Sequence, residues 1–204
     1  MALRTRDSGE RDHSLQQLQG GLVRAARLVE QMLQLARRDP ESGRPDPVAV
    51  DLGKLAESVC AELGTPILSR DLDFALDAAR GCRVTGQADW LRVLVRNLVD
   101  NAIRYAPQGG RGRVTVASDG GRCKLSVSDS GPGIPTRERD VVLPRFHRLN
   151  HGNEPGSGLG LAIVARIAEL HGAELTLADN DHAPGLLATV AWEQRADGAP
   201  GRHS

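Results

Sequence analysis

The sequence predicts an α+β fold, in which strands and helices alternate after a separate N-terminal helix. That first helix is indicated by an S-x-x-Q capping box, formed by Ser14 and Gln17. Its apolar residues then recur every three or four positions as far as Ala36, which is typical of a bundle or coiled-coil seam. A linker, ESGRPDP, follows, and from Val48 onward short strand patterns alternate with helical ones.

The expected elements after Val48 come in a definite order. We expect helices over 52–63, 89–105 and 159–171, and strands over 72–76, 83–85, 113–117, 124–128, 174–177 and 186–192. The strands at 113–117 and 124–128 form a hairpin through DGGR. The stretch 135–156 has little periodicity, which predicts a functional loop or lid. We therefore expect a helical segment with its linker at 1–45, a main domain at 46–194 and a disordered tail at 195–204.

Composition and charge narrow the possible functions. Basic and acidic residues balance at 26 each, so no net charge favours nucleic acid or anionic lipid as a direct partner. No apolar run approaches the roughly 18 residues that a membrane span needs, and no signal-peptide pattern follows Met1. We therefore expect the chain as given to be cytoplasmic.

Cysteine and lysine usage excludes several kinds of site. Cys60, Cys82 and Cys123 stand far apart without a C-x-x-C pair, which argues against a zinc site and a disulfide framework, so we expect small core residues. Lys54 and Lys124 are the only lysines, and neither follows a glycine loop. A P-loop and the phosphate-pairing lysine of eukaryotic-type kinases are therefore excluded.

The helix expected over 89–105 carries a polar group of residues. Asn97 and Asn101 lie one turn apart and share a face with Arg104 and Tyr105. Amide oxygens can ligate a hydrated Mg²⁺, and the arginine and tyrosine can donate to phosphate oxygens. Taken alone, the same pattern also fits an ordinary solvated face.

The segment DSGPGIP, from Asp129 to Pro135, directly follows a predicted strand. It places a carboxylate where glycines allow a sharp turn and the close approach of a flat ligand. Such a carboxylate can accept a hydrogen bond from the exocyclic amine of adenine. An ordinary Pro/Gly turn is the alternative for this segment.

The segment GSGLGLAIV, from Gly156 to Val164, is a glycine-rich loop that opens directly into a helix. Free backbone N–H groups and the helix dipole favour phosphate at such a place. A Rossmann fingerprint is the rival interpretation, but it requires a small residue where Leu161 or Ile163 stands, and no strand leads into the loop. The order and spacing of all three segments, with Arg148 between the last two, are more specific than any one of them.

Together these segments resemble the sensor histidine kinases, within the wider ATP-binding group that also holds gyrase, Hsp90 and MutL. RNLVDNAIRYAP is similar to the N-box, DSGPGIP to the first glycine box, PRFHRL to the phenylalanine box and GSGLGLAIV to the second glycine box. The resemblance runs from Ser14 to Trp192, because RLVEQMLQLARRDP is similar to the second helix of a dimerisation and phosphoacceptor hairpin. Within the family the chain is most similar to membrane-anchored, QseC-like kinases.

The resemblance implies a two-layer α/β sandwich, with a mixed sheet of about five strands under three helices and an N-terminal helix attached. It implies ATP and Mg²⁺ as cofactors and transfer of the γ-phosphoryl group to a histidine. A response regulator of the winged-helix, OmpR-like kind would receive the phosphoryl group, and the hairpin would form a homodimer. The full-length parent would be anchored in the bacterial inner membrane.

The resemblance also implies roles for individual residues. Asn101 would ligate Mg²⁺, with the catalytic Asn97 lining the same phosphate site, and Asp129 would accept from the adenine amine. The catalytic Arg148 would stabilise charge on the transferring phosphoryl group, and Phe146 would fix the lid. Further nucleotide-binding residues would be Arg104, Tyr105, Gly131, Gly133, Ile134, Gly156, Ser157, Gly158, Leu159, Gly160 and Leu161.

The chain departs from the family pattern in three places. Arg104 stands where lysine is common, and Pro144 stands where the phenylalanine box often has glutamate, which puts an acid/base role there in doubt. The H-box with its phosphoacceptor histidine has no match, because His13 lacks the acidic, arginine and proline residues that mark it. We therefore expect the chain to bind ATP without phosphorylating itself.

Three other functions compete with that of a histidine kinase. Hydrolytic members of the group resemble one another in using a carboxylate at the position of Asn97, and a neutral amide cannot serve as that base. A serine kinase of the anti-sigma class is disfavoured by the N-terminal heptad helix. A non-catalytic nucleotide-binding or dimer-modulating module remains the alternative.

Overall fold

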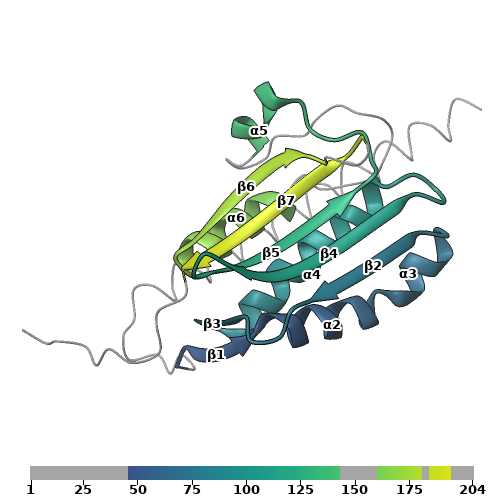
Figure 1. Cartoon of the computed structure of the whole chain (residues 1–204). Coiled ribbons are helices and arrows are strands. Elements are labelled where there is room, and N and C mark those ends of the chain that lie inside the picture. The colour runs from purple at the N-terminus through teal and green to yellow at the C-terminus, as the bar shows by residue number, and fades with distance from the viewer. Residues whose placement is uncertain (1–45, 143–159, 181–183, 194–204) are drawn as a thin grey trace, which may run out of the picture.

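The computed structural model describes residues 46–142, 160–180 and 184–193 (Figure 1). The expected N-terminal helix, most of the expected lid and the expected C-terminal tail lie outside the described residues. Within these ranges, no helix has the length and apolar character needed to cross a bilayer. The described part forms two layers, with helices on one face of a five-stranded sheet (Figure 1).

The central sheet is mixed and has the strand order β2-β4-β5-β7-β6. Strand β2 (Asp73–Ala78) runs parallel to β4 (Arg111–Asp119). Strands β5 (Arg122–Asp129), β7 (Leu186–Glu193) and β6 (Ala173–Asp179) continue the sheet in antiparallel fashion. Along β5 alternate residues are buried, and they face the helical layer. The five-stranded mixed sheet and the β4–β5 hairpin are therefore confirmed.

Three longer helices form the second layer: α2 (Leu52–Glu62), α4 (Ala88–Tyr105) and α6 (Gly160–Leu170). Helix α4 packs on β4 and β5 at the centre of the sheet, with α2 and α6 on either side of it. Its apolar residues recur every three or four positions, and burying each one contributes roughly 1.5–3 kcal/mol. The buried residues of α4 are Leu91, Leu94, Val95, Leu98, Val99, Ala102 and Ile103.

Several short elements were not expected from the sequence. Strand β1 (Val48–Asp51) and helix α3 (Gly64–Ser69), which follows α2, are among them. Strand β1 pairs with β3 (Arg83–Gly86), which was expected over 83–85, in a separate two-stranded sheet. A loop was expected from residue 135, but the structure has a helix, α5 (Thr136–Val142), at the start of that stretch, so the expectation is wrong there. The carbonyl oxygen of Pro135 accepts a hydrogen bond from the backbone N–H of Glu138 at the start of that helix. The negative charge of Glu138 in the first turn interacts favourably with the helix dipole.

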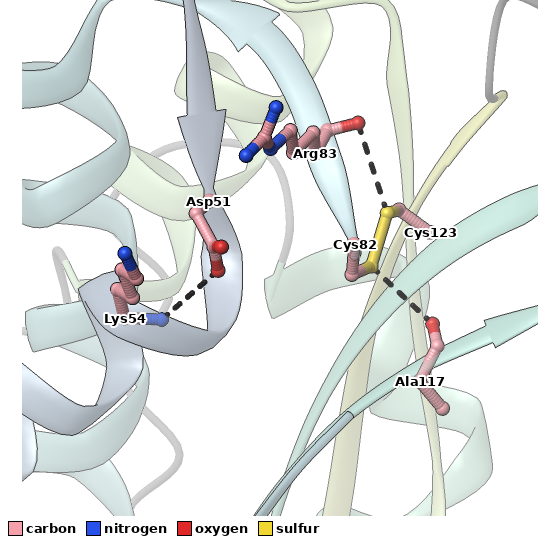
Figure 2. The surroundings of a disulfide bond; sticks show 6 residues. All are labelled: Asp51, Lys54, Cys82, Arg83, Ala117 and Cys123. Atoms are coloured by element: carbon pink, nitrogen blue, oxygen red, sulfur yellow. Dashed lines mark hydrogen bonds between the residues drawn. A yellow bond between two sulfur atoms is a disulfide. The ribbon is translucent and has the colours of Figure 1, made fainter. Parts of the chain in front are cut away.

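Two of the three cysteines form a disulfide, which corrects the expectation from the sequence (Figure 2). Cys82 and Cys123 are fully buried, as expected of core residues, but they are also bonded across a separation of 41 residues. Sequence spacing could not reveal this pair, because the fold itself brings the residue before β3 beside the start of β5, with 5.5 Å between the Cα atoms. Cys60 on α2 is a free thiol, and burial raises its pKa.

Candidate functional site

The C-terminal half of α4 meets the first residue of α6. A Cβ atom on Gly160 would lie 3.1 Å from both polar atoms of the Asn101 amide and 3.4 Å from Oδ1 of Asn97. Two segments that are more than fifty residues apart in the sequence therefore form one polar surface. The packing of α4 against α6 along their length holds them there.

The two asparagine amides of this surface differ in their hydrogen bonding. The Nδ2 group of Asn97 donates to the carbonyl oxygen of Val93 at 2.8 Å, which fixes the amide and leaves its Oδ1 on the side of Gly160. Within the described residues the half-buried Asn101 amide makes no hydrogen bond. An amide oxygen without a protein donor suits a hard cation, since Mg²⁺ prefers oxygen ligands.

Arg104 and Tyr105 extend the polar surface by one further turn of α4. Arg104 is half-buried and makes no ion pair within the described part of the chain, while Tyr105 is 42% exposed. Both side chains are therefore able to contact a ligand that reaches the end of α4. An unpaired guanidinium at this position suits phosphate oxygens.

Asp129 at the end of β5 is the one buried charged side chain among the described residues, at 6% exposure. Its Oδ1 accepts from the backbone N–H of Gly131 at 2.7 Å and from that of Leu186 at 3.4 Å. Burial raises the pKa of this carboxyl group, and the two N–H donors lower it in part. Within the described ranges no cation pairs with it, and such a buried carboxylate is a candidate for function rather than for stability.

The glycines after Asp129 are required by their surroundings. A Cβ on Gly131 would lie 2.6 Å from the carbonyl oxygen of Tyr105 and 2.8 Å from Oδ1 of Asp129. Gly133 has a φ of +71°, which side chains rarely adopt. The close contact between Gly131 and Tyr105 joins the end of α4 to the Asp129 turn, so the asparagine pair and the buried carboxylate belong to one region.

Several expected site residues have a different environment or are not described. The side chains of Ile134 and Leu161 are buried in the core. Six expected residues lie outside the described ranges: Phe146, Arg148, Gly156, Ser157, Gly158 and Leu159. The sequence reasoning missed the β6–β7 connection, where Asn180 and Leu186 contact Asp129. Only a Pro-Gly pair, which signals a turn, marks it in the sequence.

A buried carboxylate beside a glycine turn, together with an amide pair facing a helix N-terminus, defines a nucleotide-binding domain on a two-layer α/β fold. Residues 86–195 match the family model described as histidine kinase-, DNA gyrase B-, and HSP90-like ATPase. This chain belongs to that family, and it contains the ATP-binding domain of the histidine-kinase type.

Among curated proteins, the chain is similar to sensor kinases. Sensor protein QseC of Salmonella typhimurium is 38% identical over 187 residues, which cover 91% of this chain and 40% of that protein. Sensor protein kinase PmrB of Pseudomonas aeruginosa is 36% identical over 191 residues, covering 93% and 40%. This chain therefore spans only about 40% of the length of these relatives.

Among solved structures, the cytoplasmic segment of histidine kinase QseC is similar with a TM-score of 0.62 and 32% identity. The match covers 84% of this chain and 94% of that one. The expected two-layer fold and the expected similarity to QseC-like kinases are thus confirmed.

Proposed function

We propose that this chain is the ATP-binding catalytic portion of a two-component sensor histidine kinase. It binds Mg·ATP and transfers the γ-phosphoryl group to a histidine of a helical hairpin, for relay to a response regulator. One observation carries the proposal: Asp129 and the Asn97–Asn101 pair lie in the same region. Gly131, which donates to Asp129, packs against Tyr105 at the end of the helix that carries the two asparagines. An adenine-reading carboxylate and a phosphate-binding surface are what one ATP molecule needs.

We assign Asp129 to the adenine amine. Its Oδ1 already accepts two backbone N–H groups, so its other oxygen would accept from the nucleotide. A carboxylate rejects guanine, which offers a carbonyl at the same position and would leave two acceptors facing each other. Gly131 and Gly133 let the base lie close to the backbone.

The donor set at the end of α4 fits a Mg²⁺ ion that arrives with the nucleotide. The described residues hold no group of three His, Cys, Asp or Glu side chains that could cage a metal, but nucleotide-bound Mg²⁺ takes only one or two protein ligands. Asn101 would supply its amide oxygen and Asn97 would line the same space. When bound, the ion neutralises phosphate charge, while Arg104 and Tyr105 contact the phosphates directly.

The remaining roles rest on the family resemblance and on the names of the relatives. Arg148 would stabilise charge on the transferring group, and Gly156, Ser157, Gly158 and Leu159 would lie over the phosphates together with Gly160.

 We also propose that residues 46–194 form the catalytic domain and that 1–45 belong to a dimerising helical segment. The receiver would be a winged-helix, OmpR-like response regulator, and the parent protein would be anchored in the inner membrane.

Calorimetric titration of the full chain with Mg·ATP and with Mg·GTP tests the nucleotide assignment. We expect one molecule of ATP to bind per chain, and GTP to bind at least about tenfold more weakly because the buried carboxylate is left without a donor. Equal binding of the two nucleotides would remove Asp129 from its adenine-reading role.

Incubation with γ-labelled ATP tests the phosphotransfer assignment. Because no H-box accompanies His13, we expect the chain to bind nucleotide without forming phosphohistidine. Acid treatment separates labile phosphohistidine from stable phosphoserine. Acid-labile label that disappears in His13→Gln would contradict the assignment of the phosphoacceptor to a different segment.

A further inference from the structure

We propose that Asn180, which directly follows β6, is a positioning residue that holds Asp129 for adenine recognition, together with Gly185 and Leu186 before and at the start of β7. This inference rests on the proposed function, because it assumes that Asp129 reads the adenine amine. The β6–β7 connection lies outside the four sequence segments that resemble the boxes of the family. Its described residues nevertheless contact the main chain and the side chain of Asp129.

Asn180 directly follows β6 and bonds to the end of β5, 51 residues earlier in the chain. Its Nδ2 group donates to the carbonyl oxygen of Asp129 at 2.9 Å. Its backbone N–H donates to the carbonyl oxygen of Gly185 at 3.2 Å, which ties the two described ends of the connection together. The Asn180 side chain therefore fixes the main chain at the residue whose carboxylate would meet the nucleotide.

Leu186 holds the Asp129 side chain from the other end of the connection. The last register pair between β5 and β7 is Ser128 with Leu187, so Asp129 and Leu186 lie just past it. Instead of continuing the ladder, the backbone N–H of Leu186 donates to Oδ1 of Asp129 at 3.4 Å. Together with the N–H of Gly131 it engages one carboxylate oxygen, which orients the group.

Gly185 packs directly on Asp129. A Cβ atom at Gly185 would lie 1.9 Å from the Asp129 carbonyl oxygen, and one at Gly133 would lie 3.0 Å from the Gly185 carbonyl oxygen. Gly185 thus lies against both the acidic residue and the glycine turn after it. Without Asn180, the Asp129 main chain would lose the hydrogen bond that holds it under this packing.

The turn after Asp129 is also attached to β6 through a second set of contacts. The Asn180 side chain can therefore be removed without separating the turn from β6. Arg139 on α5 donates from Nε to the carbonyl oxygen of Ile134 at 2.9 Å and pairs with Asp179. This attachment holds the end of the turn and does not reach Asp129. Loss of the Asn180 amide should therefore affect the position of Asp129 while β6 and the turn stay joined.

The test compares ATP with purine riboside triphosphate, which lacks the 6-amino group, by calorimetric titration of the full chain. We expect the wild type to prefer ATP by at least about tenfold, as for a hydrogen bond to a charged group. In Asn180→Ala this preference should fall severalfold, while the affinity for purine riboside triphosphate stays the same. Asn180→Leu, which is close in size, remains neutral and removes the donor, should behave alike and is used if the alanine variant does not fold.

Thr176→Ala is the matched control, because Thr176 is an exposed polar residue on β6, the strand that Asn180 follows. It should retain the wild-type preference. An unchanged preference in both folded Asn180 variants, or equal weakening of both nucleotides, would overturn the positioning role. A wild type that binds both nucleotides equally would instead overturn the adenine-reading role of Asp129, and with it the inference, so the two failures are distinguishable.

Discussion

Gly160 at the start of α6 lies so close to Asn101 of α4 that a Cβ atom would come within 3.1 Å of both polar atoms of the amide. This distance is tighter than ordinary van der Waals contact, so a side chain at residue 160 would displace the amide. The relationship explains why a residue without a side chain is needed at this point of the glycine-rich segment. It also gives a prediction that separates binding from stability.

Gly160→Ala should weaken Mg·ATP binding by about fivefold, roughly 1 kcal/mol, because the Asn101 amide must move. The same change should leave the melting temperature equal or slightly higher, since alanine favours a helix over glycine. Calorimetry and thermal unfolding measure the two effects. Gly64→Ala is a suitable control, because a Cβ there meets nothing within 4 Å. Unchanged affinity in Gly160→Ala would show that the contact is irrelevant to binding.

Asp129 should lower stability at neutral pH. Its pKa is raised in the folded protein by burial, so the folded state favours the protonated form more than the unfolded state does. The free energy of unfolding should therefore fall as pH rises from the ordinary carboxyl pKa through the raised value. Asp129→Asn cannot titrate and can still accept from Gly131 and Leu186, so this fall should be absent from it.

Urea unfolding of the wild type and Asp129→Asn between pH 3 and pH 8 measures this difference. The free energy of unfolding of the wild type should fall by about 1.4 kcal/mol for each unit by which its Asp129 pKa is raised. The variant should be the more stable protein at neutral pH and should discriminate poorly between ATP and GTP. A variant that is less stable than the wild type at pH 7 would mean that the carboxylate is stabilised by its surroundings.

The Cys82–Cys123 disulfide should be visible by thiol counting. In denaturant without reductant only Cys60 should react, and after reduction all three cysteines should react. Cross-linking over 41 residues should stabilise the fold by about 4 kcal/mol in the chain-entropy model, so reductant should lower the melting temperature. Cys82→Ser should remove this response. Three reactive thiols before reduction would contradict the bond.

The two sulfur atoms also have acceptors near them. Cys82 Sγ lies 3.5 Å from the carbonyl oxygen of Ala117, and Cys123 Sγ lies 3.8 Å from that of Arg83 (Figure 2). Disulfide sulfurs carry no hydrogen, so these contacts become hydrogen bonds only when the pair is reduced. The reduced protein should therefore stay folded, and its circular dichroism spectrum should match that of the oxidised form.

Much of the fold was predictable because its main elements have strong local patterns. Helix α4 has a continuous apolar stripe, and the β4–β5 hairpin has a glycine pair at its turn, where Gly120 and Gly121 both take a positive φ. Helices α3 and α5 escaped prediction because they are only 6 and 7 residues long and too short for a periodic pattern.

The candidate site was predictable only where its residues form compact sequence segments. Asn97, Asn101 and Asp129 each stand in such a segment, and the structure brings these segments together through Gly131 and Gly160. The contribution of Asn180 depends on a hydrogen bond that spans 51 residues, and the disulfide spans 41. No local pattern encodes such tertiary pairs, because they arise from the order of strands in the sheet.

Titration of the full chain with ATP in the presence and absence of Mg²⁺, for the wild type and for Asn101→Ala, tests the central claim most directly. The account predicts that Mg²⁺ strengthens ATP binding to the wild type and that Asn101→Ala loses this Mg²⁺-dependent binding while its circular dichroism spectrum is unchanged. Gln108→Ala, an exposed residue just beyond α4, should bind as the wild type does. Unchanged Mg·ATP affinity in a folded Asn101→Ala protein would contradict the assignment of this surface as the nucleotide site.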